Sequence, residues 1–307
     1  MKLNSILTAT VAGFALLASG PVLADEHAEA TPQIVELASG PDGPALWKVS
    51  DEDTTIYLFG TVHVLPTDLE WYDAEIDAAL GSSDTVVTEI KMDPASEAAL
   101  SQLAQARGQF GDGTTLRSLL NEEQTASYEA ALAGLGAQPA AFDPMKPWLA
   151  SLTFSLVPLI QQGYDPNSGV DRVILSQAGD RTLDALESAE FQVGIFDGLP
   201  LDVQVAFMME AIEGMPKVKD TIDAMVAEWV EGDPDGLAVI MNEDLTDETL
   251  AEALLYSRNA TWAEWIENRL DTTPGTVFMA VGAGHLAGNK SVQQYLAQRG
   301  IETQRVQ

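Results

Sequence analysis

The sequence predicts an α/β protein with one mixed sheet built from both ends of the chain and a large, mainly helical insertion in the middle. Three observations support this prediction. Two apolar runs flank a short polar turn near residues 45–60, a helix and a further apolar run follow up to residue 90, and another apolar run occupies 275–281 after a long helical stretch. Strand and helix patterns that alternate in this way are typical of α/β sheets.

The N-terminal part of the expected sheet begins with two strands. Residues 45–49 and 54–60 are rich in apolar, β-branched and aromatic side chains, and the polar turn 50–53 between them predicts a hairpin. A helix is expected over 69–80, followed by a strand over 84–90 that ends in acidic and apolar residues. This order predicts a strand, helix, strand unit.

The insertion extends from residue 94 to about residue 270 and has mainly helical character, broken by short segments that contain glycine. One interruption, 181–186, has the composition of a strand. The chain then closes with a strand over 275–281, a helix over 290–298 and a final strand over 302–306. The two ends of the chain are therefore expected to meet in one sheet.

The first 24 residues are typical of a secretory signal peptide. Lys2 precedes an apolar run over 6–17, which is shorter than the about 20 residues that span a membrane. We expect cleavage after Ala24 and a periplasmic or secreted product with no stable membrane anchor. Residues 25–43 are expected to form a flexible leader, and 44–307 to form a single domain.

The composition narrows the classes of function. The chain has 15 basic and 47 acidic residues, a formal net charge of −32, which argues against binding to nucleic acid. The acidic residues are scattered along predicted helices, which favours a solvated, repellent surface over a cation-binding one. With no cysteine, the chain has neither disulfides nor thiol catalysis. The motifs G-x-S-x-G and H-E-x-x-H, the P-loop and the dinucleotide fingerprint are all absent.

Two of the three histidines occupy matching positions. His63 and His285 each end a G-x-x-H sequence behind a predicted strand, and the third histidine lies in the predicted leader. The motif glycines are Gly60, Gly282 and Gly284. Glycine permits a tight turn, and α/β proteins bind ligands at the carboxyl ends of their strands. We therefore expect both imidazoles to face one cleft.

Glu89 stands at the end of the neighbouring predicted strand and is the candidate third group. Two imidazoles and a carboxylate form a divalent-metal site with open coordination positions, as hydrolysis by a metal-bound water requires. Glu89 would be either a metal ligand or a general base. Arg258 would clamp a substrate carboxylate or stabilise an oxyanion, or else form a salt bridge with the abundant acids. A simpler alternative is that the histidines only brace the sheet edge.

Several segments together resemble the TraB/GumN family over nearly the whole mature chain. The main ones are LWKV at 46–49, YLFGTVHVLP at 57–66 and VGAGHLAG at 281–288. Shorter agreements are KPW at 146–148, GVD at 169–171, LE at 186–187, FDGLP at 196–200, and Arg258-Asn259 followed by Trp262. Animal relatives called TIKI proteins are metal-dependent proteases, and their two G-x-x-H motifs match His63 and His285.

The resemblance implies an exported metal-dependent hydrolase that acts on peptide bonds. It implies a site of His63, Glu89 and His285 that binds manganese, cobalt or zinc, with the family's Arg-Asn pair at Arg258 and Asn259. The family is also similar to erythromycin esterase-like and haem-binding ChaN-like proteins. The alternative is therefore a non-catalytic protein that holds a small molecule, haem or a peptide in the same cleft. The expected partner is a peptide or small-molecule substrate.

Overall fold

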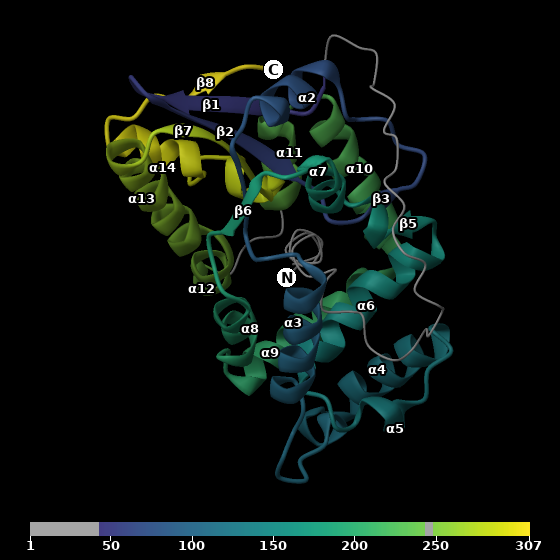
Figure 1. The fold of residues 1–307 in the computed structure, drawn as a ribbon. Helices are drawn as coiled ribbons and strands as arrows, with labels where there is room; N and C mark the ends of the chain where they lie inside the picture. Colours follow the sequence, from purple (N-terminus) through teal and green to yellow (C-terminus); the bar gives the residue numbers. More distant parts are fainter. Residues whose placement is uncertain (1–42, 243–247) are drawn as a thin grey trace.

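A computed structural model of the chain describes residues 43–242 and 248–307. It contains a six-stranded mixed sheet with helices on both faces, and a body of further helices below it (Figure 1). This architecture confirms the predicted α/β class. The predicted signal peptide and all of the predicted leader except Gly43 lie outside the described residues. Within the described ranges, no helix is long and apolar enough to span a membrane.

The strand order in the sheet is β6-β4-β7-β2-β1-β8. The strands are β1 (Leu46–Ser50), β2 (Thr54–Thr61), β4 (Thr85–Thr88), β6 (Thr182–Ala185), β7 (Gly275–Gly282) and β8 (Gln304–Arg305). The first four in this order are parallel, whereas β1 is antiparallel to both β2 and β8. Strands β2 and β7 pair along their whole length, from Thr54 opposite Gly275 to Thr61 opposite Gly282. The two ends of the chain thus form the centre of the sheet.

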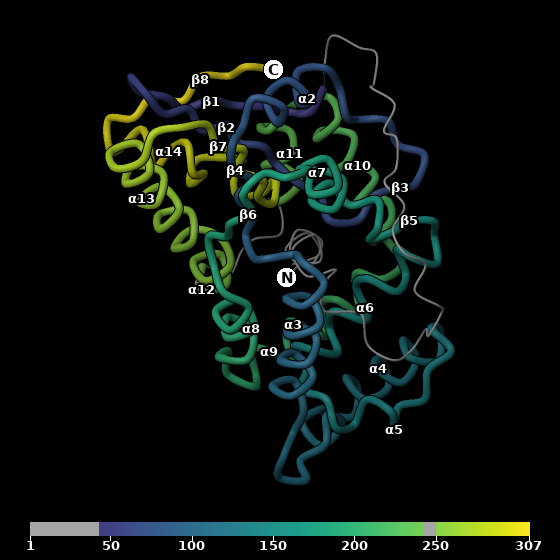
Figure 2. Tube along the Cα trace, viewed as in Figure 1, coloured from purple at the N-terminus to yellow at the C-terminus, as the bar shows by residue number. Residues whose placement is uncertain are grey.

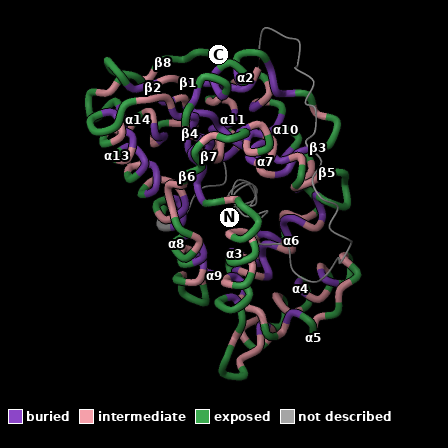
Figure 3. Tube along the Cα trace, viewed as in Figure 1, coloured by how far each residue is buried: buried purple, intermediate pink, exposed green. Residues whose placement is uncertain are grey.

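Alternation of side chains along the strands separates two cores. Phe59 and Phe278 point to one face, which is covered by α2 (Ala74–Gly81), α7 (Val170–Gln177), α10 (Val218–Val230) and α11 (Pro234–Asn242). Leu58 and Met279 point to the other face, against α13 (Ser257–Thr272) and α14 (Val292–Gln298). The central strands are buried, whereas the edge strands β6 and β8 are mainly exposed (Figure 3). Burial on both faces explains why β7 is apolar at almost every position.

The helical body has its own apolar core. The helices that contribute to this core include α3 (Pro94–Arg107), α4 (Glu122–Gly134), α5 (Pro139–Phe142), α6 (Pro147–Gln161), α8 (Ala189–Asp197) and α9 (Leu201–Gly214). The short helix α12 (Glu248–Ala251) continues through a π-helical turn at Glu252–Tyr256 into α13. The trace in Figure 2 runs from β4 into α3 and returns through β6, so the insertion contributes one strand to the sheet.

Some predicted boundaries were wrong. Helix α2 begins at Ala74 rather than at residue 69, because the Asp73 carboxylate caps it by accepting the N–H groups of Glu75 (3.0 Å) and Ile76 (2.9 Å). The final strand is shorter than 302–306. A two-stranded pair of β3 (Leu65–Pro66) and β5 (Tyr164–Asp165) was not predicted, since two-residue strands carry no periodic signal.

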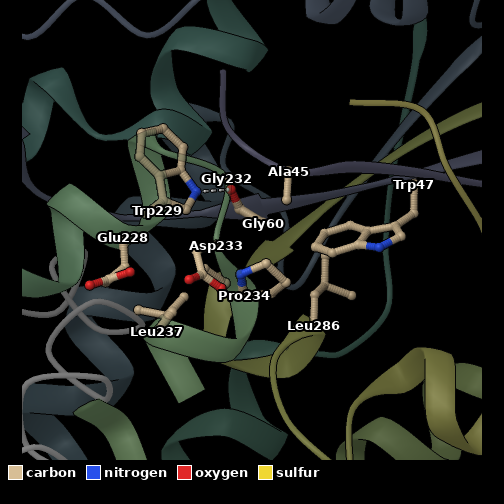
Figure 4. Close-up of a pocket in the computed structure, with 11 residues that line it drawn as sticks. Ala45, Trp47, Gly60, Glu228, Trp229, Gly232, Asp233, Pro234, Leu237 and Leu286 are labelled. Atoms are coloured by element: carbon tan, nitrogen blue, oxygen red, sulfur yellow. Dashed lines mark hydrogen bonds between the residues drawn. The ribbon is translucent and has the colours of Figure 1, made fainter. Parts of the chain in front are cut away.

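The first glycine of each G-x-x-H motif is required for space rather than for a left-handed backbone. Neither Gly60 nor Gly282 has a positive φ, so the prediction of a turn that depends on glycine conformation was wrong. A β-carbon on Gly60 would lie 3.0 Å from the Ala283 α-carbon, so the two motifs lie side by side. The Trp229 indole of α10 also donates a hydrogen bond of 2.8 Å to the Gly60 carbonyl (Figure 4).

We expect Gly60→Ala to destabilise the fold by about 1–3 kcal/mol, because the added methyl group meets backbone that cannot move aside. Gly81→Ala is the matched control. It has no atom within 4 Å of the new methyl group and a φ that alanine accepts, and it should stabilise by about 0.4–1 kcal/mol. Urea unfolding of both variants measures the difference. Equal stabilities would contradict the close approach of the two motifs.

Candidate functional site

Three of the predicted site residues meet at the carboxyl edge of the sheet. His63 follows β2, Glu89 follows β4, and His285 lies in the 3-10 turn Ala283–Leu286 directly after β7. A β-carbon on Gly282 would lie 3.1 Å from Glu89 Oε1, 3.5 Å from His285 Cδ2 and 3.9 Å from His63 Nε2. The absence of a side chain at Gly282 therefore leaves open the point on which the three groups converge.

The Glu89 carboxylate is held by three donors. Its Oε1 accepts the backbone N–H of Gly282 at 2.8 Å, while its Oε2 accepts Arg258 Nη2 at 2.5 Å and Gln192 Nε2 at 3.1 Å. Burial alone would raise the pKa of Glu89, but the Arg258 charge, followed by His285 and the Gly282 N–H, outweighs burial and lowers the pKa to about 2. Glu89 is therefore ionised, and Oε1 keeps a lone pair on the side of the imidazoles.

The His63 imidazole bonds through Nδ1 to Oδ2 of Asp171, which lies in the first turn of α7. Its Nε2 is buried and has no hydrogen-bond partner among the residues that the structure describes. Burial lowers the pKa of His63 to about 4, and Glu89 partly opposes this shift. Burial, followed by the Glu89 charge, raises the pKa of Asp171 to about 7. The His63 imidazole is therefore neutral near pH 7.

The His285 imidazole is held in a similar way by an amide. Asn259 Nδ2 donates to the Lys290 carbonyl at 2.8 Å, so its Oδ1 faces His285 Nδ1 at 2.5 Å and accepts the Nδ1 hydrogen. The bare Nε2 then lies 3.8 Å from Glu89 Oε1. Burial, together with the nearby Arg258 charge, lowers the pKa of His285 to about 3. The imidazole is therefore neutral at physiological pH.

Arg258 uses all its donors inside the protein. Nε donates to Glu187 Oε1 at 2.8 Å, and Nη2 donates to Glu187 Oε2 at 2.9 Å and to Glu89. Nη1 donates to the Leu254 carbonyl at 3.0 Å and lies 3.2 Å from His285 Nε2. Its side chain is only 7% exposed. Arg258 thus joins the acids in a buried ion pair, the alternative raised from composition, and in this arrangement has no free donor for a substrate.

Sequence reasoning assigned no site role to three residues, Asp171, Glu187 and Gln192, although the first two lie in the GVD and LE segments that resemble the family. Gln192 Nε2 donates to both Glu89 Oε2 and Glu187 Oε2, at 3.1 and 3.0 Å. Glu187 ends the predicted strand 181–186, so the rule that selected Glu89 would have selected it too. Asp171 and Gln192 lie on helices. The GVD segment marks Asp171 without giving it a role, Gln192 carries no positional signal, and only the folded chain reveals their contacts.

The donor set suits a divalent cation by its chemistry. The Asn259 amide places the His285 hydrogen on Nδ1. With the His63 hydrogen on Nδ1 as well, the two Nε2 lone pairs and one lone pair of the ionised Glu89 would be directed to the same region. Residues 43–242 and 248–307 contain no cluster of three His, Asp or Glu side chains already arranged to hold an ion. The Arg258 guanidinium beside His285 Nε2 would have to withdraw from that lone pair for all three groups to act as ligands.

We expect Arg258→Met to destabilise the protein by about 3–5 kcal/mol near pH 7, because it leaves two buried carboxylates without their cation. The pKa of Glu89 should rise in the variant, so its deficit should shrink as the pH falls and the carboxylate protonates. Arg299→Met removes two surface ion pairs and is the control, with an expected cost of about 1 kcal/mol or less. Urea unfolding near pH 7 and at a lower pH measures these costs. Equal costs for the two variants near pH 7 would contradict the burial of Arg258.

The neutral state of His285 predicts an acid-sensitive fold. Its pKa is about 3 in the folded protein, against the ordinary histidine value of 6.5. The stability that it contributes is complete above the unfolded pKa and is lost as the pH falls, by about 1.4 kcal/mol per pH unit. Between about pH 7 and about pH 5, in chelator, His285→Gln should therefore lose about 2 kcal/mol less than the wild type. Parallel losses in urea titrations would show that His285 accepts a proton in the folded state.

Comparison with known proteins agrees with the motifs. No curated protein and no solved structure matches the chain. The sequence profile of the TraB/PrgY/gumN family matches residues 45–305, which includes every site residue described above and all six strands of the sheet. The predicted resemblance is confirmed, and the chain belongs to the TraB/PrgY/gumN family.

Proposed function

We propose that the chain is an exported metal-dependent hydrolase that acts on peptide bonds, with His63, Glu89 and His285 as ligands of a divalent ion. The observation that carries the proposal is the convergence of two neutral imidazoles and one ionised carboxylate beside Gly282. A bound manganese, cobalt or zinc ion would supply Lewis acidity and an activated water. The apolar run in the first 24 residues supports a periplasmic or secreted location.

The surrounding residues prepare the three groups for this role. Asp171 and Asn259 accept the Nδ1 hydrogens, so that each imidazole presents a lone pair rather than an N–H. Gly282 and Gln192 fix the rotation of the Glu89 carboxylate. Arg258 keeps that carboxylate ionised and provides a buried positive charge close to the reacting region.

Glu89 suits the role of ligand better than that of general base. A general base works best with a pKa near the working pH, whereas the pKa of Glu89 is lowered to about 2. Such a weak base would take up a proton from water with little driving force. An ionised carboxylate that does not compete for protons is, in contrast, a good ligand for a hard divalent cation.

The test is metal binding followed by turnover, with the mature chain and its variants. Titration calorimetry with Mn²⁺, Co²⁺ and Zn²⁺ should detect one bound ion in the wild type, and a fluorogenic peptide library should reveal ion-dependent cleavage. Loss of a group that only orients a ligand costs about 10–100-fold in affinity. His63→Ala, His285→Ala and Glu89→Gln should therefore each cost about 100-fold or more. Glu70→Gln, on the exposed surface, is the matched control and should change neither the affinity for the ion nor the rate of peptide cleavage.

Three outcomes would count against the proposal in different ways. Absence of binding with all three ions would contradict the metal site. Cleavage that persists in chelator would contradict its metal dependence. One bound ion without turnover of any peptide or small-molecule ester would favour the second candidate, a non-catalytic protein that holds its ligand at this site.

A further inference from the structure

Asp171 contacts His63, one of the proposed metal ligands, and neither G-x-x-H motif includes it. Its Oδ2 meets His63 Nδ1, the nitrogen opposite the one that faces Glu89. Both groups are largely withdrawn from solvent, with side-chain exposures of 11% for His63 and 4% for Asp171. A carboxylate that is buried against one imidazole nitrogen determines which nitrogen carries the hydrogen.

The backbone around Asp171 is built to keep this contact in place. The Val170 N–H donates to the Val62 carbonyl at 2.9 Å, which attaches the start of α7 to the chain next to His63. A β-carbon on Gly169 would lie 2.2 Å from the His63 carbonyl oxygen, so only glycine permits this approach. Asp171 follows within the first helical turn. Its position relative to His63 therefore depends on backbone contacts and not on a flexible side chain.

The environment of the other nitrogen points to the same arrangement. A hydrogen on His63 Nε2 would be a buried donor without an acceptor among the described residues, and it would leave the Nδ1 lone pair facing a carboxylate oxygen. With the hydrogen on Nδ1, the N–H donates to the carboxylate oxygen, and Nε2 is left with an unpaired lone pair. A buried unpaired lone pair is tolerated better than a buried unpaired N–H. We infer that Asp171 is a positioning residue, which holds the His63 hydrogen on Nδ1 and turns a bare Nε2 toward Glu89 and His285.

The chain contains a natural comparison for this role. Asn259 holds the hydrogen of His285 on Nδ1 through a neutral amide oxygen, whereas Asp171 holds that of His63 through a carboxyl group. A carboxylate is the stronger acceptor and makes the imidazole a better electron donor. An amide at position 171 should therefore keep the hydrogen in place but weaken the donor strength of Nε2. The value of that donor strength rests on the proposed function, while the position of the hydrogen does not.

The test is ¹⁵N NMR of the imidazoles in metal-free protein. With 3 histidines in the chain, the ring signals can be assigned by substitution of each. The measurement is made at about pH 8.5, well above the ordinary pKa values of histidine and aspartate. In the wild type, His63 should carry its hydrogen on Nδ1. In Asp171→Ala it should move largely to Nε2, which free imidazoles favour in water, and in Asp171→Asn it should stay on Nδ1.

Two controls separate positioning from folding. Asp180→Ala removes an exposed acid just beyond the C-terminal end of α7 and should leave the His63 signals unchanged. The His285 ring signals should keep their wild-type shifts in every Asp171 variant, which reports that the rest of the site is folded. A wild-type hydrogen on Nε2, or an unchanged His63 in a folded Asp171→Ala, would overturn the inference.

A second measurement distinguishes this inference from the proposed function. Titration with Co²⁺ should give an affinity about 10–100-fold lower for Asp171→Ala than for the wild type, with Asp171→Asn between them. If the His63 hydrogen moves as expected but no variant, including the wild type, binds Mn²⁺, Co²⁺ or Zn²⁺, the proposed function fails and the role of Asp171 stands. If the wild type and Asp171→Ala bind Co²⁺ equally well, the position of the His63 hydrogen has no consequence for metal affinity, and the effect of Asp171 on donor strength is overturned.

Discussion

The buried ion pair between Arg258 and the carboxylates of Glu89 and Glu187 is the interaction on which the rest of the site depends. It joins the ends of β4 and β6 to helix α13, and through Gln192 it reaches the helical body. An ion pair so far from solvent is costly to form and more costly to leave incomplete. The cost of leaving either carboxylate unpaired therefore ties the parts of the chain that carry these residues to one another.

The charge of the chain makes this arrangement notable. Arg258 is the one buried lysine or arginine among the described residues, in a chain with 47 acidic and 15 basic residues. Surface carboxylates are solvated and screened by salt, whereas Glu89 and Glu187 have exchanged water for a guanidinium. A composition dominated by acids thus describes the surface of this protein, whereas the buried positive charge of the described residues lies at the place where the chemistry is proposed.

Much of the fold was predictable because its signals are local. The apolar runs of β2, β4 and β7 and the polar turn before β2 have the periodicity of strands, and the parallel order of their carboxyl ends follows from the α/β pattern. The convergence of His63, Glu89 and His285 follows from that topology. The reason for the motif glycines could not be predicted in this way. It is the close approach of Gly60 to Ala283, which lies far from Gly60 in the sequence. The partners Asp171 and Gln192 were missed for the same reason, since which helix packs over a strand end is settled by tertiary contacts.

The pairing of β2 with β7 has a consequence for the order in which the protein is made. Thr54 lies opposite Gly275, so the central strand pair can form only after the segment that follows Gly275 has been synthesised. Contacts between residues so distant in sequence form late and slowly in folding. A nascent chain therefore already carries His63, Glu89 and Arg258 while the segment with His285 is still missing, and the site cannot assemble before that segment has been made. The earlier parts of the chain cannot complete the site alone, and any activity there depends on the pairing of two strands that lie far apart in the sequence.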